Sequence, residues 1–407
     1  MYILYNIGIR VFTIIAWLVS PFSKKAMLWI KGQRGWYTDL EQKIEKGVKY
    51  TWIHCASLGE FEQGRPVIEA IKKRDEGEKI LLTFFSPSGY EVRKNYPMAD
   101  IICYLPADTP GNAARFISLV NPGKVIFIKY EFWHNYIKVL ALRSIPVYLV
   151  SGIFRKEQHF FRWYGGFFRN ILKRFRWFYV QDQRSAELLK SIGLENVSVA
   201  GDTRFDRVVQ IAATARELPV LEQFREQEKL FLAGSSWGPD EEIITEYINR
   251  YPDKMKWVFA PHEIEKSNIE RLEKLLRVKT VRYSVFNPES RDARVLIIDN
   301  IGMLSSAYRY ASIAAVGGGF GKGIHNVLEP ACWGIPVLFG PNHHKFREAI
   351  GLKDSGGGKS YSSYNEFEAA MDSLLSDNEL YRKSADSAGK YVSENAGATG
   401  LVMAGIY

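Results

Sequence analysis

Short apolar runs alternate with longer amphipathic stretches along the chain from Lys49 onward. The runs are rich in β-branched and aromatic residues, which favour strands, whereas the stretches between them repeat apolar residues with the period of a helix. The first series predicts strands at 50–55, 80–85, 101–105, 125–128, 147–150 and 177–181. Its predicted helices are 59–74, 89–95, 109–120, 133–143 and 183–192. This alternation is typical of a parallel, doubly wound α/β sheet.

A second series of the same kind begins at Lys229. Its predicted strands are 230–233, 256–260, 295–298, 313–316 and 336–339. Its predicted helices are 239–251, 263–276, 303–310 and 326–332. A polar, helix-prone stretch at 207–227 is the expected linker. We therefore expect two Rossmann-like domains, 23–206 and 228–407, facing a central cleft at the carboxyl ends of both sheets.

The first 22 residues are almost wholly apolar, and only Asn6 and Arg10 interrupt them. About 20 apolar residues cross a bilayer core, and Arg10 near the centre would cost ~2.5–3.5 kcal/mol on insertion scales. The cations that follow are Lys24, Lys25, Lys31 and Arg34. They favour retention of the rest of the chain in the cytoplasm, and no small-residue cleavage site follows the run. We predict an uncleaved membrane anchor at 1–22 that spans the bilayer or lies in its interface. The alternative is a buried first helix of the fold.

Composition limits the class of protein. The chain has 407 residues, of which 46% are hydrophobic and 24% charged, so it can build sizeable cores. Disordered, collagen-like and disulfide-scaffold proteins are thereby excluded. The cysteines, Cys55, Cys103 and Cys332, are far apart and form no C-x-x-C pair. This argues against a zinc ribbon or redox motif and fits a reducing compartment.

The positive charge is concentrated in the first half of the chain. Residues 1–200 carry 29 Lys and Arg against 17 Asp and Glu, whereas residues 201–407 carry 25 against 28. This asymmetry predicts an anionic partner for the first half, either nucleic acid or an acidic membrane surface. The apolar N-terminus favours the membrane, and we expect no nucleic-acid partner.

The stretch 154–179 combines cations with aromatic residues. It contains seven Lys or Arg, eleven aromatic residues and one acidic residue, Glu157. Such a composition suits contact with anionic lipid, and stacking on single-stranded nucleic acid would use the same residues. A structural helix with core aromatics and solvated charges is the remaining interpretation. We predict that its cations hold the protein against anionic head groups, with Arg169, Lys173 and Arg174 as the candidates.

Glu60 stands in a small-residue turn, Ala56-Ser57-Leu58-Gly59-Glu60, directly after the first predicted strand. A turn between strand and helix lies at the ligand crevice of such a sheet. Glu60 is therefore a candidate general base. The alternative is that its carboxylate only complements the helix dipole.

A glycine-rich turn, Gly317-Gly318-Gly319-Phe320-Gly321-Lys322-Gly323, follows another predicted strand. Glycines let the backbone approach a phosphate closely, and a helix N-terminus after them presents N–H groups to the anion. Asn326 and Glu329 follow with the spacing of a capping box. Alternatively, Glu329 accepts the hydroxyls of a ribose.

Metal binding and acyl transfer have little support in the sequence. His343 and His344 are neighbours, but no H-E-x-x-H or Asp/His cluster accompanies them, and no G-x-S-x-G occurs. We expect no metal and no other cofactor. No protein partner is evident.

Six segments occur in a fixed order: the apolar N-terminus and the stretches 52–60 (WIHCASLGE), 129–133 (KYEFW), 200–206 (AGDTRFD), 233–236 (AGSS) and 317–330. This ordered set covers nearly the whole chain. It resembles the 3-deoxy-D-manno-octulosonic acid (Kdo) transferases of lipopolysaccharide synthesis, which have the GT-B glycosyltransferase fold.

The resemblance implies inverting transfer of Kdo from CMP-Kdo to a lipid A precursor of the lipid IVA type. It places this reaction at the cytoplasmic face of the inner membrane. By the same resemblance the general base falls on Glu60, and transition-state stabilisers fall on Glu131 and on Arg204, where Lys is usual. The implied CMP-binding residues are Pro261, His262, Ile301, Gly302, Met303, Asn326, Val327, Leu328 and Glu329.

Three departures from the family pattern accompany these matches. His262 stands where Arg is common, Trp237 where His is usual, and Asp202 where Asn is usual. The CMP contact at position 262 is the one most affected. Two other interpretations stay open: a GT-B transferase that uses a UDP- or ADP-sugar, and a non-enzymatic membrane- or RNA-binding protein.

Overall fold

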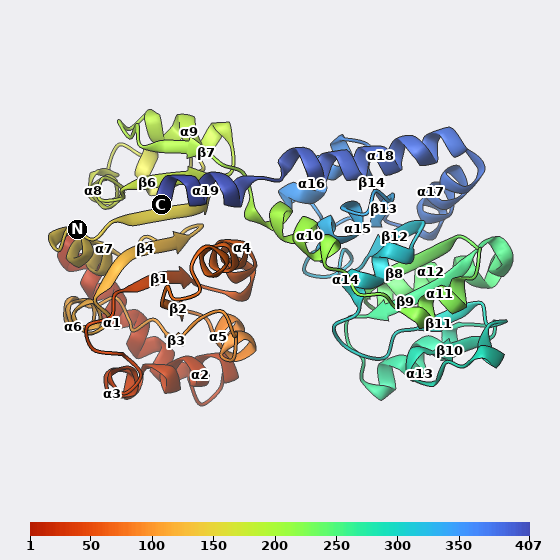
Figure 1. Cartoon of the computed structure of the whole chain (residues 1–407), viewed down its shortest axis with the longest axis horizontal. Helices are drawn as coiled ribbons and strands as arrows, with labels where there is room; N and C mark the ends of the chain where they lie inside the picture. The colour runs from red at the N-terminus through yellow and green to blue at the C-terminus, as the bar shows by residue number, and fades with distance from the viewer. The chain divides into compact units, whose positions relative to one another are not determined.

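Two parallel sheets of seven strands each organise the chain, one in each of two units. The computed structural model describes all residues from Met1 to Tyr407. Unit 1 comprises Met1–Arg207 and Ala396–Tyr407, and unit 2 comprises Val208–Asn395 (Figure 1). The predicted pair of Rossmann-like domains is confirmed.

In unit 1 the strands lie in the order β3-β2-β1-β4-β5-β6-β7, which extends the Rossmann order by one strand. The strands are β1 (Tyr50–Cys55), β2 (Ile80–Phe84), β3 (Ile101–Tyr104), β4 (Pro122–Ile128), β5 (Val147–Gly152), β6 (Trp177–Val180) and β7 (Val197–Val199). The helices are α4 (Leu58–Arg74), α5 (Pro87–Arg93), α6 (Pro110–Val120), α7 (His134–Leu142), α8 (Gly166–Leu172) and α9 (Gln183–Lys190), with a 3-10 turn η1 at His159–Phe161. Helix α10 (Thr203–Ala213) begins in unit 1 and ends in unit 2.

Every residue of β1 is buried, because helices cover both faces of the sheet. Tyr50 and Trp52 point into the core that α6 and α7 cover, whereas Ile53 and Cys55 point into the core under α4. This alternation is the period of two that a strand imposes on its side chains. Because the β1 side chains are buried in the two cores, reactive side chains are expected at the strand ends and in the turns that follow them.

In unit 2 the strand order is β10-β11-β9-β8-β12-β13-β14. The strands are β8 (Leu230–Ser236), β9 (Lys256–Pro261), β10 (Thr280–Arg282), β11 (Val295–Ile297), β12 (Ile313–Val316), β13 (Val337–Phe339) and β14 (Gly358–Ser360). The helices are α11 (Pro219–Arg225), α12 (Gly238–Arg250), α13 (Lys266–Leu275), α14 (Leu304–Ala307), α15 (Leu328–Ala331), α16 (Arg347–Asp354), α17 (Tyr364–Ser376) and α18 (Asn378–Asn395). Short 3-10 turns lie at η2 (Pro252–Lys254), η3 (Tyr283–Val285), η4 (Pro288–Ser290) and η5 (Tyr308–Tyr310).

Two predicted boundaries are wrong. The expected linker is partly core, because Leu221 and Phe224 of α11 are fully buried against β8 and β9 side chains of unit 2. The C-terminal helix α19 (Ala398–Ile406) belongs to unit 1 rather than to the second domain. Figure 1 shows this blue helix among the elements of unit 1, and its Val402 is buried in the core under α4.

Three helices precede the first sheet: α1 (Tyr2–Val19), α2 (Lys24–Gln33) and α3 (Trp36–Glu41). No residue of α1 is buried, which contradicts the alternative of a buried first helix. By length and composition α1 is long and apolar enough to cross a membrane. One side of α1 nevertheless contacts unit 1: the Tyr5 hydroxyl donates to Asp108 Oδ2 at 2.6 Å, and Asn135 Nδ2 donates to Asn6 Oδ1 at 3.0 Å.

Candidate active site

Glu60 lies in the first turn of α4, where the chain leaves β1 through Ala56 and Ser57. Its carboxylate folds back to the turn, and Glu60 Oε2 accepts a hydrogen bond from the Ala56 N–H at 2.5 Å. The residue is only 9% exposed. The predicted base is therefore a nearly buried carboxyl group held at a strand-to-helix turn.

Glu131 follows β4 and is the centre of a buried polar network. Its Oε2 accepts from Trp133 Nε1 at 2.5 Å and lies 3.2 Å from His54 Nε2. His54 Nδ1 lies 2.8 Å from Thr83 Oγ1, which already accepts from Trp52 Nε1. The two ring nitrogens of His54 therefore connect Glu131 to Thr83. The motifs 52–60 and 129–133 contain His54 and Trp133, but sequence reasoning assigned neither a role.

The two carboxyl groups influence one another. Burial raises the pKa of Glu60, the negative charge of Glu131 raises it further, and the pKa reaches about 8. The Ala56 N–H and the positive charge of Lys129 oppose this rise without cancelling it. A glutamate whose pKa is raised in this way is a stronger base than a solvated one.

Arg204 is the second residue of α10, and Asp202 just before the helix binds its guanidinium group. Arg204 Nη2 donates to Asp202 Oδ2 at 2.7 Å, and Arg204 Nε donates to the same oxygen at 3.0 Å. Gln63, one turn after Glu60 on α4, donates to Asp202 at 3.3 Å. Burial alone would raise the pKa of Asp202, but the Arg204 charge and hydrogen bonds hold it below its usual value. Arg204 is thus attached to the helix that carries Glu60.

The predicted nucleotide residues all lie in unit 2. The glycine-rich turn after β12 is tightly packed: a Cβ on Gly317 would meet the Ser235 carbonyl oxygen at 2.3 Å, and one on Gly319 would meet Gly340 Cα at 2.5 Å. Asp240 of α12 accepts from the Gly318 N–H at 3.0 Å. Burial raises the Asp240 pKa to about 6. Glycine is required here because backbone segments approach one another.

Glu329 does not form the reciprocal capping box. The N-cap of α15 is Val327, which makes no side-chain cap bond. Glu329 Oε1 instead accepts from Asn326 Nδ2 at 3.1 Å, and Oε2 accepts from Ser305 Oγ at 2.7 Å. Asn326 Oδ1 in turn accepts from the Leu328 N–H at 3.2 Å. The carboxylate therefore links the turn before α15 to α14.

The remaining predicted contacts lie on neighbouring turns of unit 2. Pro261 ends β9, and the following His262 N–H donates to the Ser236 carbonyl at 3.0 Å. Gly302 has a φ of +91°, and Ile301 beside it is 86% exposed. Met303 caps α14. These residues lie at the carboxyl ends of β9 and β11, as the crevice rule predicts.

Three rings form a stacked cluster in unit 2. His262 stacks on Trp237 with ring centroids 4.6 Å apart and on His325 at 4.4 Å. Trp237 Nε1 donates to His325 Nε2 at 3.0 Å. Burial, followed by the neighbouring His262, lowers the His325 pKa to about 4. The residues at two of the departures from the family pattern, Trp237 and His262, therefore touch one another.

Several residues of the segment 154–179 that were predicted to contact lipid are instead part of the unit 1 core or hold its backbone. Phe160 and Phe178 are buried in the unit 1 core, and Arg169 Nη1 donates to the Phe160 and Arg162 carbonyls at 3.2 and 3.0 Å. Arg174 is half-buried, and only Lys173 of the three predicted cations is fully exposed. Trp163 is the most exposed aromatic residue of this segment, at 91%.

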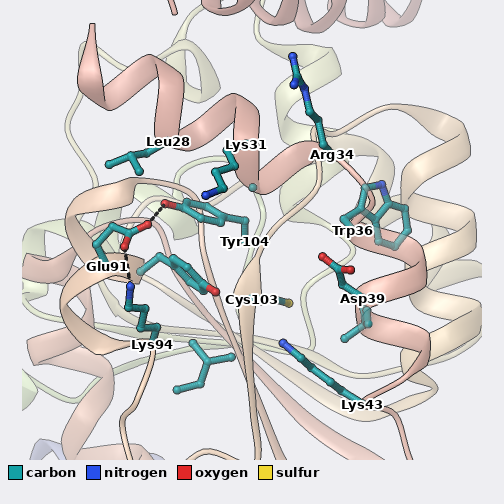
Figure 2. Close-up of a pocket in the computed structure, with 14 residues that line it drawn as sticks. Leu28, Lys31, Arg34, Trp36, Asp39, Lys43, Glu91, Lys94, Cys103 and Tyr104 are labelled. Carbon is teal, nitrogen blue, oxygen red and sulfur yellow. Dashed lines mark hydrogen bonds and ion pairs between the residues drawn. The ribbon is translucent and has the colours of Figure 1, made fainter.

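A separate cavity of about 350 Å³ lies among α2, α3, α5 and β3. Figure 2 shows Glu91 between the Tyr104 hydroxyl, which donates at 3.4 Å, and Lys94, whose Nζ lies at 2.9 Å. None of the predicted catalytic residues lines this cavity. No group of three or more His, Cys, Asp or Glu side chains in the structure is arranged to hold a metal ion.

Comparison with known proteins gives a family match in unit 1 and relatives that cover most of the chain. Residues 30–207 match the family described as 3-deoxy-D-manno-octulosonic-acid transferase (kdotransferase). A 3-deoxy-D-manno-octulosonic acid transferase of Aquifex aeolicus (strain VF5) is 30% identical over 332 residues, which are 80% of this chain and 86% of that protein. The chain belongs to the Kdo transferase family.

A further Kdo transferase, from Haemophilus influenzae, is 24% identical over 85% of this chain and 84% of its own. Among solved structures, UDP-GlcNAc 2-epimerase from Neisseria meningitidis has a TM-score of 0.61 at 17% identity, covering 88% of this chain and 99% of that chain. MurG from Acinetobacter baumannii has a TM-score of 0.54 at 14% identity, covering 88% and 99%. These structures confirm the GT-B-like fold, and family membership makes the chain a Kdo glycosyltransferase.

Proposed function

We propose that this enzyme transfers Kdo from CMP-Kdo to a lipid A precursor with inversion at the anomeric carbon. The observation that carries the proposal is Glu60, a buried carboxyl group at a strand-to-helix turn whose pKa is raised to about 8. An inverting transfer needs one base to take the proton of the acceptor hydroxyl, and Glu60 meets that requirement.

In the proposed step, Glu60 accepts the hydroxyl proton while the acceptor oxygen forms a bond to the Kdo anomeric carbon. The bond from that carbon to the CMP phosphate oxygen breaks, and the electron pair leaves with CMP. Arg204, held by Asp202, offsets negative charge during the reaction. Glu131 keeps the Glu60 pKa high and presents an ordered carboxylate beside Trp133.

The donor is assigned to unit 2. CMP-Kdo carries one phosphate, and we assign it to the glycine-rich turn after β12 at Gly321, where a Cβ would meet no atom closer than 3.6 Å. Glu329 offers carboxylate oxygens for the ribose hydroxyls, and the backbone around Gly302 is exposed for the base. We propose no metal and no other cofactor for this reaction.

The acceptor side is assigned to unit 1 and to the membrane surface. Helix α1 has an exposed apolar side, and cations follow it in α2. We propose attachment to the inner membrane with both units in the cytoplasm, because cations flanking an apolar segment stay on that side.

Product analysis tests the proposal. The purified full-length enzyme is incubated with CMP-Kdo and a tetra-acylated lipid A precursor, and product masses are measured. We expect a mass increase of one or more Kdo units and release of CMP. Protection against thermal unfolding by CMP but not by UDP or ADP supports the donor. Protection by UDP or ADP alone would favour a different nucleotide sugar.

A further inference from the structure

An apolar groove runs along α1 in unit 1. It consists of two adjoining cavities of about 390 and 300 Å³ that share Phe12, Trp29 and Phe85. The outer cavity is lined mainly by α1 and α2, and the inner one reaches Trp133. The rings of Phe12 and Trp29 are 5.4 Å apart and those of Phe85 and Trp133 are 5.0 Å apart. Aromatic walls thus continue from one cavity to the other.

The position of α1 creates this groove. The hydrogen bonds of Tyr5 to Asp108 and of Asn6 to Asn135 hold the first turns of the helix against unit 1. Towards its other end α1 contributes Phe12, Ala16 and Val19 to the groove wall. Ile14 and Leu18 of α1, which do not line the groove, are 56% and 57% exposed.

The inner end of the groove meets the proposed catalytic network. Trp133, which lines the inner cavity, donates through Nε1 to Glu131 Oε2 at 2.5 Å. Glu131 acts on the Glu60 carboxyl through its charge. The outer end, at Val19, Ser23 and Lys25, lies where the anchor helix gives way to basic residues. The groove therefore runs from the expected membrane surface to Trp133, which donates a hydrogen bond to Glu131.

We propose that the groove binds one acyl chain of the lipid acceptor and so positions its sugar hydroxyl for Glu60. This proposal rests on the proposed function. A saturated hydrocarbon chain suits the groove, because its lining between the ends is almost wholly apolar and aromatic. Continuity with Glu131 at one end and an apolar, exposed helix at the other favour a lipid substituent attached to the reacting sugar.

Two neighbouring residues of α2 give a matched test. Ala26 lines the groove, whereas Met27 is 49% exposed and does not line it. Ala26→Phe should fill the outer cavity, and Met27→Phe should leave it open. Both variants are assayed with the acylated precursor and with the same phosphorylated disaccharide after deacylation.

We expect Ala26→Phe to raise KM for the acylated acceptor at least ~10-fold, because excluding each methylene weakens binding about fourfold. Its turnover of the deacylated acceptor should equal that of the parent, and Met27→Phe should match the parent on both. Equal KM values for Ala26→Phe and parent would overturn the proposal. An equal loss on both acceptors would also overturn it, since the variant would then act on the catalytic site.

Photo-crosslinking provides a second measurement on the unmodified chain. An acceptor with a diazirine in one acyl chain should label peptides that contain Trp29 and Phe85. Labels confined to the outward residues Ile14 and Leu18 would refute the groove while leaving the reaction intact. Failure of the parent to transfer Kdo to any lipid acceptor would instead refute the proposed function.

Discussion

The role of Glu60 as general base can be tested through the pH dependence of the rate and through its substitution by Gln. Its pKa of about 8 means that the carboxylate form, which is the active base, increases as pH rises through neutrality. We expect kcat/KM to rise with pH and to level off above about pH 8. Glu60→Gln should bind CMP normally, lose at least ~10²-fold in kcat and lose this pH dependence.

Glu62, half a turn along α4, supplies the control. It pairs with Arg93 at 2.9 Å and lines none of the cavities described. Glu62→Gln should keep both the rate and the pH profile of the parent. Near-normal turnover by Glu60→Gln would remove Glu60 from the mechanism.

Asp202 and Arg204 depart from the family pattern together, and they touch. We expect Arg204→Lys to lose activity, because a Lys ammonium cannot reproduce the bonds from Nη2 and Nε to the Asp202 carboxylate. Asp202→Asn combined with Arg204→Lys restores the usual family pair. The double variant should exceed Arg204→Lys in kcat by about tenfold, the scale of one coupled hydrogen-bonded charge pair. Additive losses in this double-mutant cycle would show that the pair does not act as a unit.

Glu329 connects two secondary-structure elements, because its carboxylate joins the turn before α15 to Ser305 of α14. Glu329→Gln keeps a polar side chain of the same size. If the carboxylate holds the ribose hydroxyls, CMP affinity should fall by roughly 1.5–3 kcal/mol, the scale of a charged hydrogen bond. Calorimetry measures this. Ser305→Ala, which removes only the hydroxyl partner, is the control, and an unchanged CMP affinity in Glu329→Gln would assign Glu329 a structural role.

The exposed cations of the segment 154–179 include Arg155, Lys156 and Arg162, and Arg162 directly precedes the exposed Trp163. Each cation near an anionic surface contributes ~1 kcal/mol. Replacing the three by Gln should reduce the preference of the full-length protein for anionic over neutral liposomes in co-sedimentation at low salt. The apolar contribution of α1 is common to both kinds of liposome and cancels in this ratio. An unchanged preference would show that these charges are only solvated.

The strands of the two sheets show which elements could be predicted from the sequence pattern. The buried runs of β1, β4 and β8 were predicted because strands covered on both faces are continuously apolar. β7, β10 and β14 were not predicted, because each has three residues and an edge position, too short for a periodic signal. Helices α16 to α19 were also not assigned.

Residues of the candidate site could be predicted from the sequence only where they lie within a recognisable motif. Glu60, Glu131 and Arg204 stand in such motifs, and the structure places all three in unit 1. The bond between Tyr5 and Asp108 joins residues 103 positions apart, and no local pattern marks either partner. The boundary at α19 was missed for the same reason, since tertiary contacts alone decide where a terminal helix packs.

At the scale of the whole molecule, Asp206 attaches the C-terminus to unit 1. Its Oδ1 accepts from the Gly397 N–H at 2.5 Å, and its Oδ2 accepts from the Thr399 N–H and hydroxyl, each at 2.6 Å. Asp206→Ala should weaken the start of α19 by about 0.5–2 kcal/mol, the usual cost of losing a helix cap. Hydrogen exchange of the α19 amides should become faster, whereas exchange in β8 should not change. Equal protection of α19 in variant and parent would show that packing alone holds the helix.

The close fit of α19 has a consequence for synthesis on the ribosome. Gly405 packs so tightly on β6 that a Cβ there would meet the Tyr179 hydroxyl at 2.0 Å, and Val402 fills the core under α4. Unit 1 therefore needs the last twelve residues of the chain, Ala396–Tyr407, although its sheet is translated first. The nascent enzyme exposes the apolar α1 and an unfinished core during the whole translation of unit 2. The proposed membrane attachment of α1 would shield its apolar side during this time, whereas the core under α4 is completed only when α19 docks.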